Sequence, residues 1–229
     1  MQNKIKNPLF YEENRIAAHS DHKYYVSKAE FVQQIQSLKK PLDGVWKFHY
    51  AKNMAEAPDG FYKNDTDCRS WEDIHVPAHI QLEGYDKPQY VNVQYPWDGH
   101  EVIEPGEIPT RFNPTASYVK YFTVPAQFAG KRVFLSFQGV ESGFALWCNG
   151  SYIGYSEDSF TPSEFELTDV LKAGENKLAV QVYKWTSGSW CEDQDFFRFS
   201  GIFRSVYLYA IPDTHVSDVK IQTNLNADF

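Results

Sequence analysis

From residue 117 onward, short runs of apolar and aromatic residues are separated by polar turn residues. Runs of roughly 4–8 residues that are rich in Val, Ile, Tyr, Phe and Trp are typical of β-strands. The dipeptide Asn149-Gly150, which lies between two such runs, favours a two-residue hairpin of type I′. The pattern predicts strands over residues 118–124, 132–137, 144–148, 152–155, 177–183 and 206–209.

Two more strands are predicted in the first half of the chain. Trp46, Phe48 and Tyr50 alternate with polar residues, which predicts a half-buried strand over 45–50, and residues 74–77 form a short run ended by proline. About eight short strands with one early helix indicate an all-β protein. The predicted fold is an antiparallel β-sandwich, with a jelly roll as the expected form.

The early helix is predicted over residues 27–40. Ser27 and Glu30 have the spacing of a capping box, and Pro41 stops the pattern. Apolar residues at helical spacing would share one face: Phe31, Val32, Ile35 and Leu38.

Composition narrows the class of protein. The 229 residues are 17% aromatic and carry a net charge of −8, so a globular core is expected and nucleic acid is not an expected partner. No run is long and apolar enough for a membrane span, and no signal peptide opens the sequence. The odd number of cysteines, without metal-like spacing, predicts reduced thiols and a cytoplasmic location.

Residues 187–204 form the first candidate for a functional site. Sugars are bound by carboxylates, which contact their hydroxyls, and by aromatic rings, which contact their C–H faces, and this stretch offers both. The alternative interpretation is a structural salt bridge between Asp193 or Asp195 and one of two arginines, Arg198 or Arg204. The other side chains of interest here are Glu192, Trp190, Phe196, Phe197, Phe199 and Phe203.

A second candidate is the irregular stretch 79–96, which is too aromatic for a disordered linker. Long irregular segments within compact domains are often binding loops. This one carries Tyr85, Tyr90, Asn92 and Tyr95. A packed structural loop is the alternative, and it fits the tyrosines better than Asn92.

The last residues suggest a division of the chain. Residues 216–225 predict another strand that has no partner within the sequence. We therefore expect an amino-terminal arm over 1–26, a sandwich domain over 27–212, and over 213–229 a linker with the first strand of a truncated second β domain.

Several long motifs in this order resemble the amino-terminal sugar-binding domain of glycoside hydrolase family 2 β-galactosidases of the large lac-operon type. The resemblance covers nearly the whole chain. It rests on residues 14–19, 42–46, 76–96, 146–150 (LWCNG), 154–159, 162–165, 173–178 and 192–204 (EDQDFFRFSGIFR).

The resemblance implies one domain of a much longer enzyme that hydrolyses terminal β-D-galactosides such as lactose with retention. Retaining hydrolysis requires two carboxyl groups that flank the scissile bond. In the family, both lie in a separate catalytic barrel, so no catalytic residue is expected in this chain. The resemblance also implies that the strand within 213–229 is the first of a truncated immunoglobulin-like domain. It further implies contact with the remaining domains of the same polypeptide and, at full length, a homo-oligomer.

The resemblance places substrate-binding residues in both candidate segments. Asn92 and Asp195 match the family's asparagine and aspartate that reach the galactose site, and the backbone of Val93 lines the same pocket. The aspartate also binds a sodium ion whose other ligands come from the barrel. Oxygen ligands suit such a hard cation.

A second metal of the family matches this chain less well. Family members can hold magnesium between the arm and this domain through four oxygen ligands. The matching positions here are Lys4, Asn7, Glu157 and Ser187, so a lysine and a serine replace two of the ligands. Asn7 and Glu157 alone would make a doubtful magnesium site.

Two alternatives remain open at this point. One is a free-standing carbohydrate-binding module or lectin, which would not leave the strand over 216–225 unpaired. The other is the same domain of a β-glucuronidase or β-mannosidase, since these enzymes share the fold.

Overall fold

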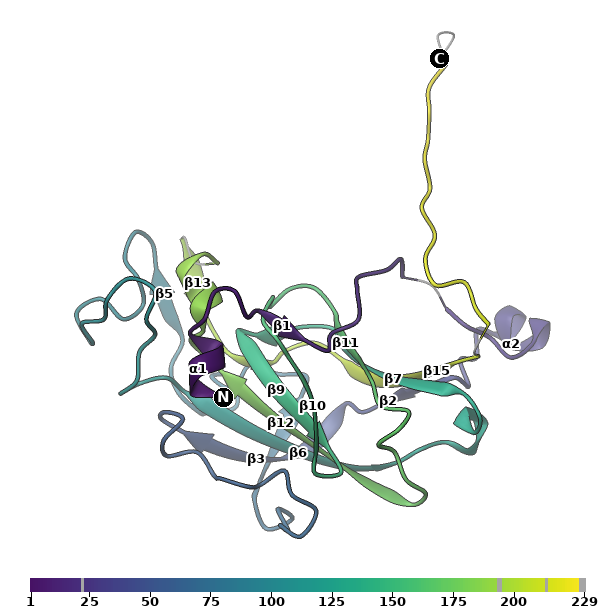
Figure 1. The fold of residues 1–229 in the computed structure, drawn as a ribbon, viewed down its shortest axis with the longest axis horizontal. Helices are drawn as coiled ribbons and strands as arrows, with labels where there is room; N and C mark the ends of the chain where they lie inside the picture. Colours follow the sequence, from purple (N-terminus) through teal and green to yellow (C-terminus); the bar gives the residue numbers. More distant parts are fainter. Residues whose placement is uncertain (22, 193–194, 213, 227–229) are drawn as a thin grey trace.

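The computed structural model describes residues 1–21, 23–192, 195–212 and 214–226, and it is built from two packed antiparallel sheets (Figure 1). The larger sheet has the strand order β1-β10-β9-β12-β6-β3-β4. Its strands are β1 (Glu12–Glu13), β10 (Ser151–Ser156), β9 (Gly143–Cys148), β12 (Glu175–Tyr183), β6 (Thr115–Thr123), β3 (Gly44–Ala51) and β4 (Glu72–Val76).

The smaller sheet has the order β11-β7-β15-β2, and two short ribbons, β13-β5 and β14-β8, stand beside the sheets. These strands are β11 (Ser163–Glu166), β7 (Arg132–Phe137), β15 (Val206–Ile211), β2 (Lys39–Pro41), β13 (Phe196–Arg198), β5 (Gln89–Val91), β14 (Gly201–Ile202) and β8 (Val140–Glu141). The predicted all-β antiparallel sandwich is confirmed.

The main core lies between the two sheets. Alternate residues of each strand point inward, so the large sheet contributes Trp46, Phe48 and Leu146, and the small sheet contributes Leu135 and Leu208. All five are almost completely buried. Burial of large apolar side chains on this scale is the main favourable term in folding.

A second core covers the outer face of the large sheet. Trp147 of β9 stacks on Tyr62 of the loop after β3, with ring centroids 4.7 Å apart, and Ile5 of the arm is buried in the same cluster. Loop and arm therefore bury the side of β9 and β12 that would otherwise face water. This explains why every residue of β9 is buried although a two-layer sandwich favours alternation.

The predicted hairpin turn is present. Asn149 and Gly150 both have positive φ, +50° and +83°, as a type I′ turn requires. The Asn149 side chain also donates to the carbonyl oxygen of Val170 at 2.8 Å, which ties the turn to the next connection.

The helix prediction was too long. Helix α2 covers only Lys28–Gln33, capped by the Ser27 hydroxyl, which accepts from the Glu30 N–H at 3.2 Å. Gln34 adopts a left-handed conformation (φ +56°), which ends the helix, and residues 39–41 enter β2 instead. A second short helix, α1 (Gln2–Ile5), was not predicted, and two 3₁₀ helices cover Ala126–Phe128 and Ser187–Trp190.

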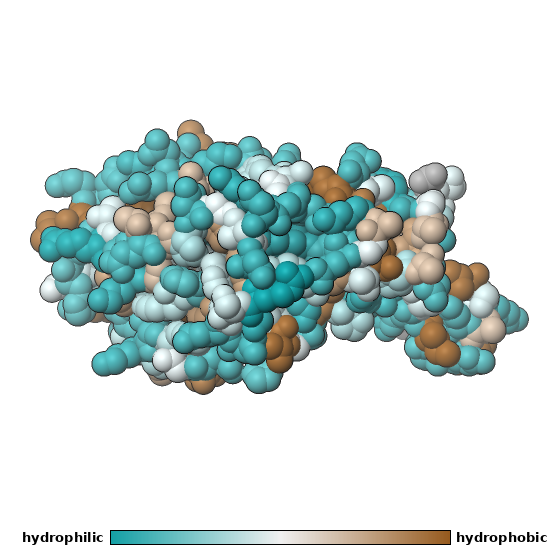
Figure 2. All heavy atoms as spheres, turned by 90° about the horizontal axis from the view of Figure 1, so that it is seen from below, coloured by the Kyte–Doolittle hydropathy of each residue, from teal (hydrophilic) through white to brown (hydrophobic). Residues whose placement is uncertain are grey.

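The strand predicted over 216–225 is not formed in the described part of the chain, where residues 214–226 leave the body of the molecule (Figure 1). Hydrogen bonds attach the start of this segment to the arm: the Tyr24 hydroxyl donates to the Val216 carbonyl oxygen at 2.7 Å, and the Val219 N–H donates to the Ser20 hydroxyl at 2.9 Å. Helix α2 is also unusual, because it buries no residue and leaves Phe31 and Val32 exposed. Figure 2 shows apolar side chains on the lobe at that end of the molecule. Within the described residues, no helix is long and apolar enough to cross a membrane.

Buried Glu141 in β8 gives a testable pH dependence. Burial raises the pKa of its carboxyl from 4.5 to about 7. The folded chain therefore binds the proton more tightly than the unfolded chain, so this contribution to stability is complete below pH 4.5 and is lost as pH rises to about 7. At roughly 1.4 kcal/mol per pKa unit, the loss is at most about 3.5 kcal/mol.

We expect Glu141→Gln to remove this dependence. The difference in unfolding free energy between the natural chain and the variant, measured by urea denaturation, should decrease between pH 4.5 and 7. A difference that stays constant across this range would contradict the assignment.

Candidate functional site

A two-stranded ribbon brings the two predicted substrate-binding residues together. In the ribbon of β5 and β13, Tyr90 is paired with Phe197. At its end, the N–H of Asp195 donates to the carbonyl oxygen of Asn92 at 3.2 Å. The structure thus places the two predicted residues side by side, although they are far apart in the sequence.

Tyr90 joins the side chains of this pair. Its hydroxyl donates a short hydrogen bond to a carboxylate oxygen of Asp195. That bond is the main reason why the pKa of the Tyr90 phenol is raised, while a further hydrogen bond with the Asn92 side chain opposes the rise. Asp195 has a left-handed backbone (φ +57°), a conformation that aspartate adopts more readily than most residues. We call Tyr90, Asn92 and Asp195 the ribbon cluster.

The ribbon cluster is open to solvent. All three residues are exposed, and the neighbouring Val93 is 87% exposed. A phenol, an amide and a carboxylate held on paired strands can exchange hydrogen bonds with the hydroxyl groups of a ligand. Sequence reasoning placed Tyr90 on a binding loop but missed that it connects the other two residues, because no local pattern reveals a contact across the ribbon.

The alternative of a salt bridge at Asp195 is not supported. Among the described residues, no ion pair joins Asp195 to either arginine. Arg204 donates to a backbone carbonyl oxygen at 2.7 Å, and the buried Arg198 donates to another at 3.4 Å. Asp193, the other carboxylate in that alternative, lies outside the described residues. Glu192 instead accepts from the Ser159 hydroxyl at 3.3 Å.

Aromatic rings form a continuous row that starts at the ribbon cluster. Neighbouring ring centroids along the row are 4.6–6.1 Å apart. Four of the rings belong to exposed residues, which is unusual for a group of this size and marks a contact surface. In order, the aromatic row comprises Tyr90, Phe197, Phe199, His79, Phe203, Phe160 and Phe196.

The four positions of the doubtful magnesium site lie in different settings. Lys4 forms an ion pair with Glu13 at 2.6 Å, and the side-chain oxygen of exposed Asn7 accepts from a backbone N–H of its own turn at 3.0 Å. Glu157 and Ser187 do meet, because the Ser187 hydroxyl donates to Glu157 at 3.2 Å. Within the described residues, no cluster of three or more His, Cys, Asp or Glu side chains could hold a metal.

Glu157 is saturated by neutral donors. Its carboxylate accepts from the Tyr155 hydroxyl at 2.7 Å, the Thr186 hydroxyl at 3.0 Å and the Gly188 N–H at 2.9 Å, in addition to Ser187. A Cβ at Gly188 would lie 2.8 Å from this carboxylate, so a larger residue there would have to displace it. Burial nevertheless raises the Glu157 pKa, since the donors carry no charge.

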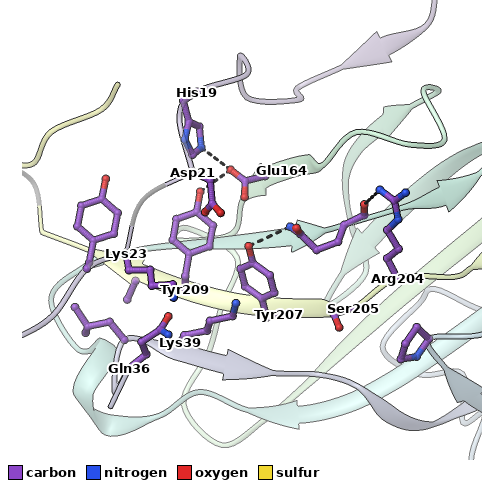
Figure 3. Close-up of a pocket in the computed structure, with 15 residues that line it drawn as sticks. His19, Asp21, Lys23, Gln36, Lys39, Glu164, Arg204, Ser205, Tyr207 and Tyr209 are labelled. Atoms are coloured by element: carbon purple, nitrogen blue, oxygen red, sulfur yellow. Dashed lines mark hydrogen bonds and ion pairs between the residues drawn. The ribbon is translucent and has the colours of Figure 1, made fainter. Parts of the chain in front are cut away.

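A separate hollow of about 500 Å³ lies between the arm and the small sheet (Figure 3). Its polar groups bind one another: His19 contacts Glu164 at 2.7 Å, and the Tyr209 hydroxyl donates to the same carboxylate at 2.8 Å. Gln138 donates to the Tyr207 hydroxyl at 3.0 Å. These contacts attach the arm to β11 and β15, which is a structural role.

The fold and the ribbon cluster together define a β-sandwich module with an exposed polar cluster beside a row of aromatic rings. Comparison with protein families matches residues 38–212 to the sugar binding domain of glycosyl hydrolases family 2. This match covers most of the chain, and the chain therefore belongs to that family.

Curated relatives agree with this assignment. The chain is 55% identical over 214 residues to a protein of Halalkalibacterium halodurans named Beta-galactosidase, covering 93% of this chain and 21% of the relative. It is 54% identical over 228 residues to a Beta-galactosidase of Clostridium acetobutylicum, covering 98% of this chain and 25% of the relative. The chain thus spans about a fifth to a quarter of these proteins.

Solved structures share the fold at lower identity. A Bacteroides uniformis beta-glucuronidase 2, covalently bound to cyclophellitol-6-carboxylate aziridine, superposes with a TM-score of 0.58 at 22% identity. The match covers 76% of this chain and 18% of that one. At this identity, the likeness shows the fold alone.

The role of Glu157 as a buried hydrogen-bond acceptor can be tested through the stability of the fold. Glu157→Ala would leave three hydroxyls and the Gly188 N–H without their acceptor in a buried place, and we expect a loss of about 3 kcal/mol or more in unfolding free energy. Glu157→Gln keeps one acceptor oxygen and should lose less. As a matched control, Glu166→Ala removes an exposed ion pair with Arg132 and should cost under about 1 kcal/mol. Equal losses for Glu157→Ala and the control in urea denaturation would contradict this role.

Proposed function

We propose that this chain is the amino-terminal sugar-binding domain of a β-galactosidase that hydrolyses terminal β-D-galactosides such as lactose with retention. Within that enzyme, it supplies one wall of the galactose site. The proposal is supported by relatives named Beta-galactosidase that are 54–55% identical to the chain. The glucuronidase alternative is supported only by structural matches near 22% identity.

The ribbon cluster is the observation that carries the proposed role. Asp195 is held by Tyr90 through one carboxylate oxygen, which leaves the other oxygen for a sugar hydroxyl. The pairing of β5 with β13 fixes both strands before a ligand arrives. Such preorganisation lowers the entropy that binding would otherwise lose.

The aromatic row supports a contact between this wall and the rest of the enzyme. Its exposed rings begin at Tyr90 and continue to Phe160 and Phe196. Apolar surface of this kind is normally covered in the complete protein. We propose that the downstream catalytic domain packs on the row and thereby meets Asn92 and Asp195 at the galactose site, with the backbone of Val93 beside them.

The proposal concerns two metal positions, one for sodium and one for magnesium. Asp195 would supply one oxygen ligand to a sodium ion, and the remaining ligands would come from the catalytic domain, because a hard cation takes about six or more oxygens. We propose that protein contacts take the place of the magnesium ion in this chain. Glu157 accepts hydrogen bonds from four neutral donors, and Lys4 forms an ion pair with Glu13.

The protein is also proposed to act in the cytoplasm as a homo-oligomer. Three free thiols, at Cys68, Cys148 and Cys191, support a reducing compartment. The exposed apolar side chains Phe31 and Val32 of α2 support burial of that lobe in an assembly.

The chain by itself is expected to be inactive. Hydrolysis with retention needs an acid and a nucleophile about 5 Å apart on either side of the bond, and the ribbon cluster offers a single carboxylate. Purified chain should release no chromophore from a chromogenic β-galactoside. Turnover above the blank, at a rate that follows the chain through purification, would contradict the proposal.

Sugar affinity separates the domain from a free-standing carbohydrate-binding module. One wall of a pocket should bind galactose at millimolar concentration or more weakly. Calorimetric binding in the micromolar range would favour the module.

In the full-length enzyme, Asp195→Asn should lower kcat/KM by roughly ten- to a hundredfold and weaken activation by sodium. The estimate follows from about 1.5–3 kcal/mol for a hydrogen bond to a charged group, at about 1.4 kcal/mol per tenfold. Asparagine tolerates the left-handed backbone, so the substitution removes charge without strain. Tyr90→Phe, which releases the carboxylate but keeps its charge, should reduce kcat/KM less and preserve sodium activation.

Thermal unfolding of the same two variants serves as the control. Both residues are exposed, so the unfolding temperature should change little. Unchanged kinetics together with a clear loss of stability would remove Asp195 from the site.

A further inference from the structure

A second hollow, of about 610 Å³, lies between the irregular residues 86–112 and the end of β12. Its volume is in the range of ordinary ligand pockets. Neither Asn92 nor Asp195 lines it, so it is separate from the ribbon cluster. The residues that matter here are Tyr50, Asp86, Trp97, Phe112, Lys184 and Trp185.

The hollow contains a buried ion pair. The Lys184 ammonium lies 2.5 Å from a carboxylate oxygen of Asp86, and the two side chains are only 1% and 5% exposed. Gln81 donates to that same oxygen at 2.9 Å. Among the described residues, the Lys184 ammonium makes no other hydrogen bond, and the second oxygen of Asp86 receives none.

This pair has hydrogen-bonding capacity to spare. An ammonium has three donors and a carboxylate has about four acceptor sites, and the protein uses only part of each. Burial lowers the Lys184 pKa, as expected for an ammonium that has lost water and regained a single partner. A ligand hydroxyl could accept from Lys184 and donate to Asp86 at once, which a purely apolar ligand could not do.

Aromatic rings form the remaining walls. Trp97 and Trp185 meet edge to face, with centroids 6.0 Å apart, and the ammonium of Lys184 lies 5.1 Å from the Trp185 ring centre. Phe112, which is 45% exposed, stands at the mouth with Tyr50. A ring-shaped ligand with C–H faces suits such walls.

The charge of the lining is opposite to that of the chain. Four basic side chains line the hollow against two carboxylates, Asp86 and Glu101, while the whole chain carries −8. Glu101 is already held by the backbone N–H groups of Thr110 and Arg111 at 3.0 and 3.1 Å. The basic residues are Lys52, Lys87 and Arg111, all exposed, and the buried Lys184.

We propose that this hollow is a second carbohydrate site, and that it binds a monosaccharide carrying an anionic group. The sugar ring lies against Phe112 and Tyr50, and a hydroxyl bridges Lys184 and Asp86. The anionic group lies among the exposed basic side chains at the mouth. A phosphate ester and a carboxylate both meet this requirement, and titration with one sugar of each kind distinguishes them.

The test uses the whole 229-residue chain and the indole N–H signals of Trp97 and Trp185 in a ¹⁵N–¹H spectrum, assigned from the Trp97→Phe and Trp185→Phe variants. The probes are glucose 6-phosphate, glucuronate, glucose and inorganic phosphate. We expect one or both anionic sugars to shift these signals with a Kd of about a millimolar or below. Glucose and phosphate alone should bind at least tenfold more weakly.

Variants locate the binding. Asp86→Asn combined with Lys184→Met removes both buried charges together, so neither is left unpaired. This double variant should weaken binding of the anionic sugar at least tenfold. If the double variant unfolds, Lys52→Gln combined with Arg111→Gln provides an alternative at exposed positions. This second variant should weaken the binding of the anionic sugars and leave the binding of glucose unchanged.

Asp195→Asn is the matched control, because it alters the ribbon cluster and should leave this binding unchanged. The proposal is overturned when no probe shifts the two indole signals, when glucose binds as well as the anionic sugars, or when Asp195→Asn abolishes the shifts. Because the readout does not involve galactoside turnover, it is independent of the proposed function.

Discussion

The structure depends on burial of the central strands β9 and β12 from both sides. Their inner side chains meet the small sheet, and their outer side chains meet the arm and the loop after β3. Lys177 in β12 shows how firmly that loop is attached, since its buried ammonium donates to the carbonyl oxygens of Phe61, Lys63 and Thr66 at 2.6–2.8 Å. Each of these charge-assisted bonds replaces a lost water contact.

This double burial explains why the proposed binding features lie where they do. Because both faces of the central strands are covered, the irregular segments beyond the strand ends remain available for contact with a ligand or another domain. The ribbon of β5 and β13 and the hollow beside Lys184 both belong to such segments, and a rigid sandwich supports them. Loops held by a rigid scaffold are the usual carriers of function.

The buried polar groups of this protein differ in how many of their hydrogen bonds the protein supplies, and their roles differ accordingly. Glu157 is saturated by hydrogen bonds and holds the turn that follows β12. Glu141 is buried with a raised pKa and makes stability depend on pH. Lys184 and Asp86 keep unused donors and acceptors beside a hollow. The difference lies in how completely each group is satisfied, because an unsatisfied buried group favours a ligand or water.

The sequence by itself determined eight of the strands, the hairpin turn at Asn149 and the family motifs, since these follow from local alternation, turn chemistry and residue order. It missed the short strands β1, β2, β5, β8, β11, β13 and β14, which depend on their pairing partners. It overextended helix α2, because the left-handed conformation of Gln34 is not visible in an apolar spacing. It also predicted a strand over 216–225, where the described residues form none. Only the tertiary structure brought Asn92 and Asp195 to one ribbon end under Tyr90, and Asp86 to Lys184. These contacts join residues far apart in the chain, and their pairing is set by sheet register and burial rather than by any local pattern.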